Sequence, residues 1–255
     1  MKKHQYDNIG RKVFFLYPDT AEENIIREII NSEFEVYIVQ DYTKVSAIEK
    51  LYQGSIFILN TDFPLPEYSW SEFIKKDILG CRLREPVLCV IGTPNSCSSV
   101  VKTVQNLPNH YAIITRQKNQ NSLSKHVLAF LEEHNARGQR RYVRYGVNDK
   151  NATFSFFYNS REYAGTINDI SAAGMSCVFN DKTEFSLQTN LPTISLLLGE
   201  KKLTLSGQVT LRRRINEDEN LYVIMFNRRQ NERKTEKIHE FIFHSLQEQM
   251  EVRLS

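Results

Sequence analysis

Residues 203–211, LTLSGQVTL, alternate between apolar and polar side chains along most of their length. A period of two places successive side chains on opposite faces of an extended chain, and it is typical of a strand with one buried face. The apolar face would carry Leu203, Leu205, Val209 and Leu211, and the polar face Thr204, Ser206, Gln208 and Thr210. We expect antiparallel strands throughout the second half of the chain, where the pattern recurs at Phe154, Phe156 and Tyr158.

Residues 221–226, LYVIMF, are apolar on both faces, which indicates a strand that is covered on both sides. The predicted cover is a final helix over residues 230–250. Its helical period gives one apolar stripe, made by Ile238, Phe241, Ile242 and Leu246. Short strands followed by such a helix predict a small antiparallel β-barrel closed by a C-terminal helix.

The first half of the chain has a different rhythm, in which short apolar runs alternate with helical patterns. Strands are predicted at residues 13–17, 36–39, 55–59, 87–91 and 111–115, and helices at 44–52, 70–78, 97–106 and 122–134. A further helix would follow the first strand, capped by Thr20 with Glu23 three residues later. Alternation of this kind predicts a flavodoxin-like α/β domain with a parallel sheet covered on both faces.

The composition is that of a globular protein. The chain has 255 residues, of which 41% are hydrophobic and 25% charged, and these values suit one large or two ordinary globular domains. A formal net charge of +3 does not indicate a general polyanion binder. The N-terminal stretch MKKHQYDNIGRK has no apolar signal core, and no apolar run is long enough to cross a bilayer. We therefore expect a cytoplasmic protein without a membrane span.

No pattern of catalytic or metal-binding residues is present in the sequence. The four cysteines form no C-x-x-C pair and have no histidine at ligand spacing: Cys81, Cys89, Cys97 and Cys177. Buried free thiols in a reducing compartment are the favoured interpretation. The six histidines show no nucleophile or metal pattern, so we expect no enzymatic activity, no metal and no cofactor.

Positive charge is concentrated at residues 137–146, RGQRRYVRYG, which contain four arginines. Arg140 and Arg144 form the pattern R-x-x-x-R, and Arg137 and Arg141 form a second, overlapping one. Downstream, residues 169–174 read DISAAG, which is D-x-S-x-x-G. The arginines alone would indicate a solvated basic linker. The second motif, which falls between two predicted strands, favours a binding site.

The two motifs in this order resemble the PilZ domain family, over about residues 137–248. The later LSGQVTLRRR and LYVIMF segments also look like the paired closing strands of that family. The resemblance implies binding of cyclic di-GMP by Arg140, Arg144, Asp169, Ser171 and Gly174. Arg137 and Arg141 would be additional contacts, to a second, stacked ligand molecule.

The residue types suit this ligand, which carries two phosphates and two guanines. An arginine fork can bond a phosphate or the O6/N7 edge of guanine, and its plane can stack on a base. Asp169 can accept hydrogen bonds from guanine N–H groups, and Ser171 lies two residues on, on the same strand face. Gly174 would supply a turn with positive φ, or allow the ligand to approach the backbone.

Residues 11–134 resemble a response-regulator receiver domain, in which an aspartate after the third strand accepts a phosphoryl group and acidic residues hold magnesium. Here Asn60 stands at the acceptor position, followed by Pro64, and Tyr17 and Pro18 stand at the acidic pair. Ile91 and Thr115 stand at the positions of the switch hydroxyl and lysine. Asp19 and Asp62 lie nearby in the sequence. The departures favour a degenerate, inert receiver-like domain.

The sequence thus predicts a receiver-like domain (1–134), an arginine-rich linker (135–146) and a PilZ barrel with its helix (147–255). We expect a cyclic di-GMP effector whose mobile linker is ordered by the ligand, which changes the domain arrangement and the binding of a downstream, motility-related protein. Three alternatives stay open: a ligand-independent adaptor, a nucleic-acid-binding protein using the same arginines, and a phosphorylated regulator with a PilZ output.

Overall fold

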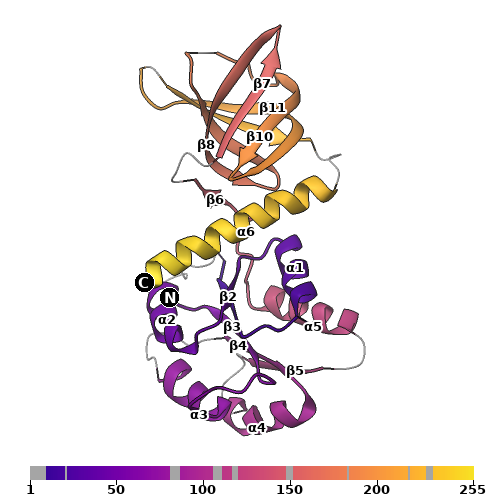
Figure 1. Ribbon diagram of the computed structural model, residues 1–255, viewed down its shortest axis with the longest axis vertical. Coiled ribbons are helices and arrows are strands. Elements are labelled where there is room, and N and C mark those ends of the chain that lie inside the picture. Colours follow the sequence, from indigo (N-terminus) through magenta and orange to yellow (C-terminus); the bar gives the residue numbers. More distant parts are fainter. Residues whose placement is uncertain are drawn as a thin grey trace. The chain divides into compact units, whose positions relative to one another are not determined.

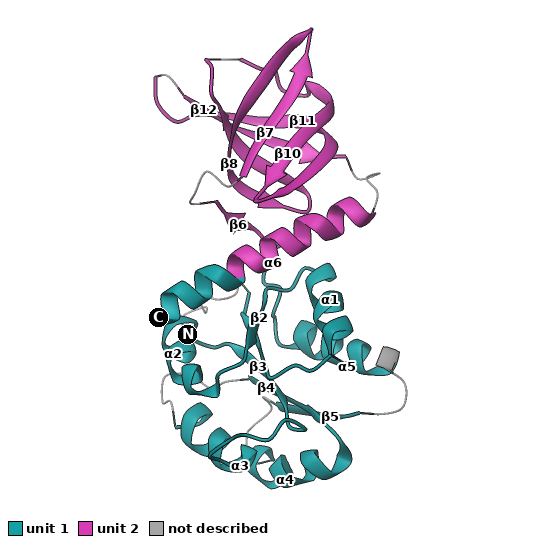
Figure 2. Cartoon of the chain, viewed as in Figure 1, with its two compact units in different colours: residues 1–141, 247–255 teal, residues 142–246 magenta. Residues whose placement is uncertain are grey.

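The computed structural model describes two compact units (Figure 2), formed by residues 1–141 with 247–255 and by residues 142–246. The description covers residues 10–20, 22–80, 87–105, 111–116, 120–147, 152–182, 184–217, 219–227 and 232–255. Cys81, His4 and His110 lie outside these residues. The first of the two compact units, which has the α/β fold, is called unit 1, and the second, which forms the barrel, is called unit 2.

Unit 1 is built on a five-stranded parallel sheet in the order β2-β1-β3-β4-β5, the order of flavodoxin-like folds (Figure 1). The strands are β1 (Val13–Leu16), β2 (Val36–Val39), β3 (Ile56–Asn60), β4 (Val87–Gly92) and β5 (Tyr111–Thr115). Each predicted strand is confirmed to within one residue at either end. The strands β1, β3 and β4 are buried along their whole length, as expected for a sheet with helices on both faces.

The helices of unit 1 fall where the apolar periodicity predicts them. They are α1 (Glu23–Asn31), the 3₁₀ turn η1 (Tyr42–Lys44), α2 (Val45–Leu51), α3 (Trp70–Phe73), the π turn η2 (Ile74–Ile78), α4 (Pro94–Val104) and α5 (Gln120–Glu133). The predicted Thr20 cap is wrong, because α1 begins after Glu22. Helix α4 begins three residues earlier than predicted, since Thr93 caps it and Pro94 occupies its first turn.

Unit 2 is an antiparallel barrel of six strands with the short strand β6 on its edge. The strands are β6 (Tyr145–Gly146), β7 (Ala152–Tyr158), β8 (Arg161–Ser171), β9 (Gly174–Phe179), β10 (Asn190–Leu198), β11 (Lys201–Arg214) and β12 (Asn220–Phe226). They follow the order β6-β8-β7-β10-β11-β12-β9, and pairing of β8 with β9 closes the barrel. Rings of Phe154, Phe156, Phe179, Phe185 and Tyr222 pack inside it.

Two details of the barrel differ from the sequence prediction. Leu211 is 46% exposed, because a register shift between Val209 and Leu211 exchanges the two faces of β11 at that point. Strand β12 is not covered on both sides, since Met225 is 40% exposed while its neighbour Ile224 is fully buried. The outer face of β11 and β12 therefore carries apolar side chains that reach solvent.

Helix α6 (Glu232–Leu254) follows the barrel. Its buried residues include the predicted Ile238, Ile242 and Leu246, while Phe241 is half-buried and its ring lies against Tyr145 at 5.8 Å between centroids. The last residues of the helix belong to unit 1, where the Gln247 side-chain amide exchanges two hydrogen bonds of 2.9 Å with the backbone of Ile38. Those bonds satisfy part of the open edge of β2. Within the described residues, no helix has the length and apolarity needed to cross a bilayer.

Candidate functional site

The predicted ligand site in unit 2 is organised by the pairing of β6 with β8. Tyr145 lies opposite Ile170 and Gly146 opposite Asp169, so Arg144 comes level with Ser171. The Arg144 Nη1 atom is 3.9 Å from Asp169 Oδ1. Both side chains reach solvent, with 56% of Arg144 and 37% of Asp169 exposed. The structure therefore places one arginine of the linker motif beside the carboxylate of the second motif.

The residues of DISAAG occupy the end of β8 and the start of β9. Ile170 is fully buried in the barrel, which leaves its neighbours Asp169 and Ser171 on the outer side. The second oxygen of Asp169 accepts a hydrogen bond from the Ser176 hydroxyl. The Ser171 hydroxyl donates to the Gly174 carbonyl at 3.2 Å and so closes the turn between the strands. Ser171 is 7% exposed, so its hydroxyl is used within the turn.

Close packing of β9 against β12 requires a glycine at position 174. It is not among the residues with positive φ, so the predicted role in a left-handed turn is wrong. A Cβ atom at this position would lie 2.5 Å from the Ile224 carbonyl oxygen and 3.1 Å from Met225 Cα. The absence of a side chain lets β9 pair tightly with β12, which keeps Asp169 and Ser176 in register.

The other arginines of the segment belong to unit 1. The Arg137 guanidinium donates to the Ser32 carbonyl at 2.9 Å and lies 4.8 Å from the centre of the Phe34 ring. Arg140 and Arg141, which end the first segment of unit 1, are exposed. Contacts of Arg137 thus lie at one end of the segment and the pairing of β6 lies at the other, and the mobility of residues 135–146 without ligand stays a prediction.

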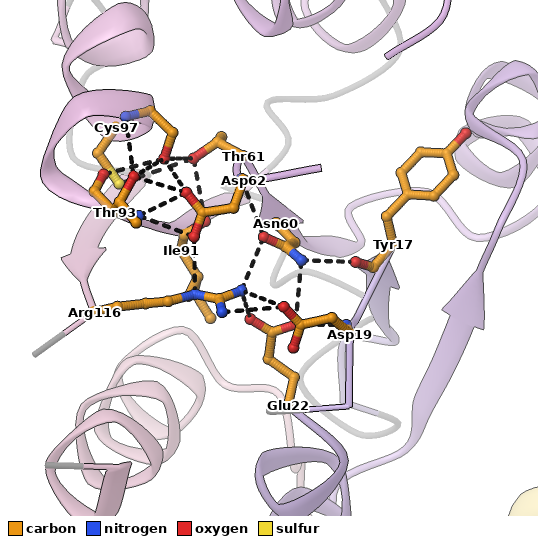
Figure 3. A network of polar contacts seen from close by, with 11 residues as sticks. Tyr17, Asp19, Glu22, Asn60, Thr61, Asp62, Ile91, Thr93, Cys97 and Arg116 are labelled. Atoms are coloured by element: carbon orange, nitrogen blue, oxygen red, sulfur yellow. Dashed lines mark hydrogen bonds and ion pairs between the residues drawn. The ribbon is translucent and has the colours of Figure 1, made fainter. Parts of the chain in front are cut away.

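A second concentration of polar groups lies at the carboxyl edge of the parallel sheet in unit 1 (Figure 3). Asn60, at the end of β3, is 1% exposed and fully hydrogen-bonded. Its Nδ2 donates to the Tyr17 carbonyl at 2.9 Å and to Glu22 at 3.2 Å, and its Oδ1 accepts from the Asp62 amide at 3.1 Å. Tyr17 has φ of +51°, an unfavourable value that turns this carbonyl toward Asn60.

Arg116 lies at the centre of this network and was not identified from the sequence. Its Nη atoms donate to Asp19 Oδ2 at 3.1 Å, to Asn60 Oδ1 at 3.1 Å and to Glu22. Its Nε lies 3.1 Å from Asp62 Oδ2 as an ion pair, although the N–H is not aligned for a hydrogen bond. A charged residue directly after a predicted strand was the available signal, since such positions meet at one edge of a parallel sheet.

The hydroxyls at this edge come from the start of α4. Thr93 donates to Asp62 from both its amide, at 2.8 Å, and its hydroxyl, at 2.9 Å, and the Ser96 hydroxyl donates at 2.6 Å. Burial alone would raise the pKa of Asp62, but these hydrogen bonds and the Arg116 charge lower it overall. A hydroxyl residue, Thr93, and a cation, Arg116, thus stand two residues after Ile91 and one residue after Thr115.

Two buried carboxyls in unit 1 have a raised pKa, in contrast to Asp62. Burial raises the pKa of Glu22 to about 7, with partial offset from the Asp19 amide and the Arg116 charge. Burial likewise raises the pKa of Glu49 to about 7, with partial offset from the Ser55 and Gly54 amides and the Arg11 charge. Both groups hold a proton more tightly in the folded chain than in the unfolded chain.

These shifts predict that unit 1 loses stability as pH rises. A carboxyl with a raised pKa stabilises the fold fully below its ordinary pKa of 4.5 and loses that contribution as pH passes through about 7. Between pH 5 and 8 we expect the free energy of unfolding to fall, and Glu49→Gln to reduce this fall by about 1 kcal/mol. Urea titrations followed by fluorescence of Trp70, the single tryptophan of the chain, measure it.

Glu28→Gln, at an exposed position of α1, is the matched control and should leave the pH dependence unchanged. The lowered pKa of Asp62 has the opposite effect on stability. Its ionised form stabilises the folded chain, and this contribution is lost only as pH falls below the ordinary value of 3.8. Stability of unit 1 that rises from pH 5 to 8 would contradict the assignment.

Comparisons with known proteins find structural similarity over part of the chain. No family model and no curated protein match the chain. Solved structures resemble part of it: E. coli YcgR in complex with c-di-GMP (15% identity, TM-score 0.39) and the PilZ domain of E. coli YcgR with c-di-GMP (14%, 0.37), each over 44% of this chain. The K. pneumonia MrkH–c-di-GMP complex matches over 44% as well (20%, 0.40).

The match covers 48% of that YcgR chain, 94% of the isolated PilZ domain and 55% of MrkH. Part of the chain is therefore distantly similar to proteins that were solved with c-di-GMP, and the match spans about half of the two longer proteins.

Proposed function

We propose that this protein binds cyclic di-GMP on the outer face of the unit 2 barrel and acts as a non-enzymatic effector. The observation that carries the proposal is the approach of the Arg144 guanidinium to the Asp169 carboxylate, at 3.9 Å, on a solvent-exposed strand edge. An exposed cation and an exposed hydrogen-bond acceptor side by side suit a ligand that combines phosphates with guanine N–H donors.

The contact between Arg144 and Asp169 in the free protein is weak. Their separation exceeds hydrogen-bond distance, and exposed ion pairs contribute about 0–1 kcal/mol. Exchanging this contact for a charge-assisted bond to phosphate and for guanine N–H groups therefore loses little and gains about 1.5–3 kcal/mol per bond. Ser176 keeps the Asp169 carboxylate in place through the oxygen that does not face Arg144.

Four further residues that were assigned to the site from the sequence differ in how each could contribute. Gly174 acts through the packing of β9 against β12, and Ser171 contributes by shaping the turn with its own hydrogen bond. Arg140, exposed and four residues before Arg144, would bind a phosphate. Arg137 already has partners in unit 1, which makes it the weakest candidate for a direct ligand contact.

Binding is tested by calorimetric titration of the full chain with cyclic di-GMP, with cyclic di-AMP and GTP as controls. The proposal expects saturable binding of cyclic di-GMP alone, because cyclic di-AMP lacks the guanine N–H donors for Asp169 and GTP lacks the second guanine and the cyclic pair of phosphates. No response to cyclic di-GMP would favour the ligand-independent adaptor. Tight binding of DNA or RNA that weakens steeply with salt would favour the nucleic-acid alternative.

The effector step is a change in the arrangement of the two units. The chain passes between the units twice, at residues 141–142 and 246–247, and the first passage lies within the arginine segment. Ligand that holds Arg140 and Arg144 would restrict that passage and expose or hide a surface for a downstream, motility-related protein. We expect small-angle scattering profiles of the full chain to differ with and without cyclic di-GMP, and identical profiles would contradict the rearrangement alone.

A further inference from the structure

We propose that Arg116 is a fixed internal cation that closes the carboxyl edge of unit 1 and holds it in one arrangement in the absence of any divalent metal ion. The inference concerns unit 1 alone and does not depend on ligand binding by unit 2. The carboxyl edge is where open α/β sheets most often bind ligands, so a closed edge has consequences for the function of the unit.

Three carboxylates from separate parts of the chain converge at this edge. Asp19 follows β1, Glu22 precedes α1, and Asp62 follows β3. Glu22 is 1% exposed, and Asp62 is 22% exposed at the side chain. Several carboxylates at one partly buried place require a positive charge, because mutual repulsion and loss of hydration both oppose their ionisation.

Arg116 supplies that charge from a fixed position. Its backbone amide donates to the Gly92 carbonyl at 2.8 Å, which anchors the residue at the end of β4 and β5. From there the guanidinium reaches all three carboxylates and the Asn60 amide oxygen, as Figure 3 shows. A planar fork with five N–H donors can serve four oxygen groups at once, which a lysine ammonium cannot do in one plane.

The surrounding space is filled by side chains of unit 1 itself. A Cβ atom placed on Gly92 would lie 2.4 Å from both Ser96 Oγ and Thr61 Oγ1, and 3.2 Å from Asp62 Oδ1. Asp62 already accepts hydrogen bonds from Thr93 and Ser96. Within the described part of the chain, no three His, Cys, Asp or Glu side chains are arranged to hold a metal ion. The carboxylates are thus directed at the guanidinium.

Arg116 should contribute more to the stability of unit 1 than an ordinary surface arginine does. Removing it takes away the counter-charge of Asp19, Glu22 and Asp62, so that buried Glu22 must take up a proton or stay charged without a partner, and either outcome destabilises the unit. Without the guanidinium, the carboxylates are free to turn toward a small divalent cation, because carboxylates are the preferred ligands of Mg²⁺, Ca²⁺ and Mn²⁺. Dependence on divalent cations should therefore appear only when Arg116 is absent.

The test compares the full-length protein with Arg116→Ala and with Arg27→Ala, which changes an exposed arginine of α1. Thermal unfolding of unit 1 is followed by Trp70 fluorescence in MgCl₂, MnCl₂ or CaCl₂, and in NaCl of equal ionic strength. We expect no cation-specific shift in Tm for the wild type or Arg27→Ala. Arg116→Ala should unfold at a lower Tm and recover part of the loss with a divalent cation.

Two results would overturn the proposal: a Tm of the wild type that rises specifically with a divalent cation, or an Arg116→Ala variant as stable as the wild type. If Arg116→Ala does not fold, Arg116→Lys, which keeps the charge but not the fork, takes its place, and it should unfold at a lower Tm than the wild type but recover less with a divalent cation, because a positive charge remains. An independent test adds Mn²⁺ to the wild type and records its amide NMR spectrum. Selective broadening of the amide NMR signals of Asp62 and Thr93 would contradict a closed edge.

Discussion

Arg144→Ala should lower the affinity of the protein for cyclic di-GMP about 10- to 100-fold. The variant removes a charge-assisted hydrogen bond worth about 1.5–3 kcal/mol, and each 1.4 kcal/mol changes the dissociation constant tenfold. The side chain is 56% exposed and its contact with Asp169 is long, so folding of the barrel should be unaffected. Calorimetric titration at fixed salt measures the change.

Arg137→Ala is the matched control for this prediction. It removes an arginine of the same segment whose partners are the Ser32 carbonyl and the Phe34 ring in unit 1. Its effect on affinity should stay within about threefold, since less than 1 kcal/mol of binding energy is involved. Equal losses for the two variants would mean that the segment acts through general charge, and the specific site at Arg144 would be wrong.

Gly174→Ala should destabilise unit 2 by about 1–3 kcal/mol, whether or not ligand is present. The added methyl group would meet the Ile224 carbonyl at 2.5 Å, and a backbone oxygen cannot move away without breaking the β9–β12 pairing. Native-state hydrogen exchange of the amides in β9 and β12 measures the loss. Gly146→Ala, where nothing lies within 4 Å of the added Cβ, should exchange as slowly as the wild type.

This variant separates the ligand-approach role that the sequence predicts for Gly174 from the packing role that the structure indicates. A glycine needed only for approach of the ligand would leave hydrogen exchange unchanged and weaken binding alone. Faster exchange in the free protein supports the packing role, in which the glycine holds Asp169 and Ser176 in register.

The strands of both units could be predicted from the sequence because burial and periodicity coincide in them. The parallel strands of unit 1 read as short apolar runs, and Leu203, Leu205 and Val209 are buried as their alternation predicts. Leu211 could not be placed, because the register shift in β11 depends on its pairing with β12. A single inserted residue reverses the faces that follow, and no local signal marks it.

The candidate sites were predictable to different degrees. The resemblance of their two motifs to the PilZ family connects Arg144 with Asp169, and the structure brings the two side chains to 3.9 Å. The Arg116 network could not, because its members come from distant segments that meet only when the sheet forms. The start of α1 was not predicted either: Thr20 is the residue type of a helix cap, but Glu22 is the residue that precedes the helix, and its carboxylate accepts a hydrogen bond from the Asp19 amide at 2.7 Å.

The most direct measurement for the central claim is the amide NMR spectrum of the full chain during titration with cyclic di-GMP. A ligand held between Arg144 and Asp169 should cause the largest shift changes at residues 144–146 and 169–176, the segments that β6, β8 and β9 bring together. The core of unit 1 around Trp70 should shift little. An unchanged spectrum, or changes largest away from these segments, would contradict the proposed site.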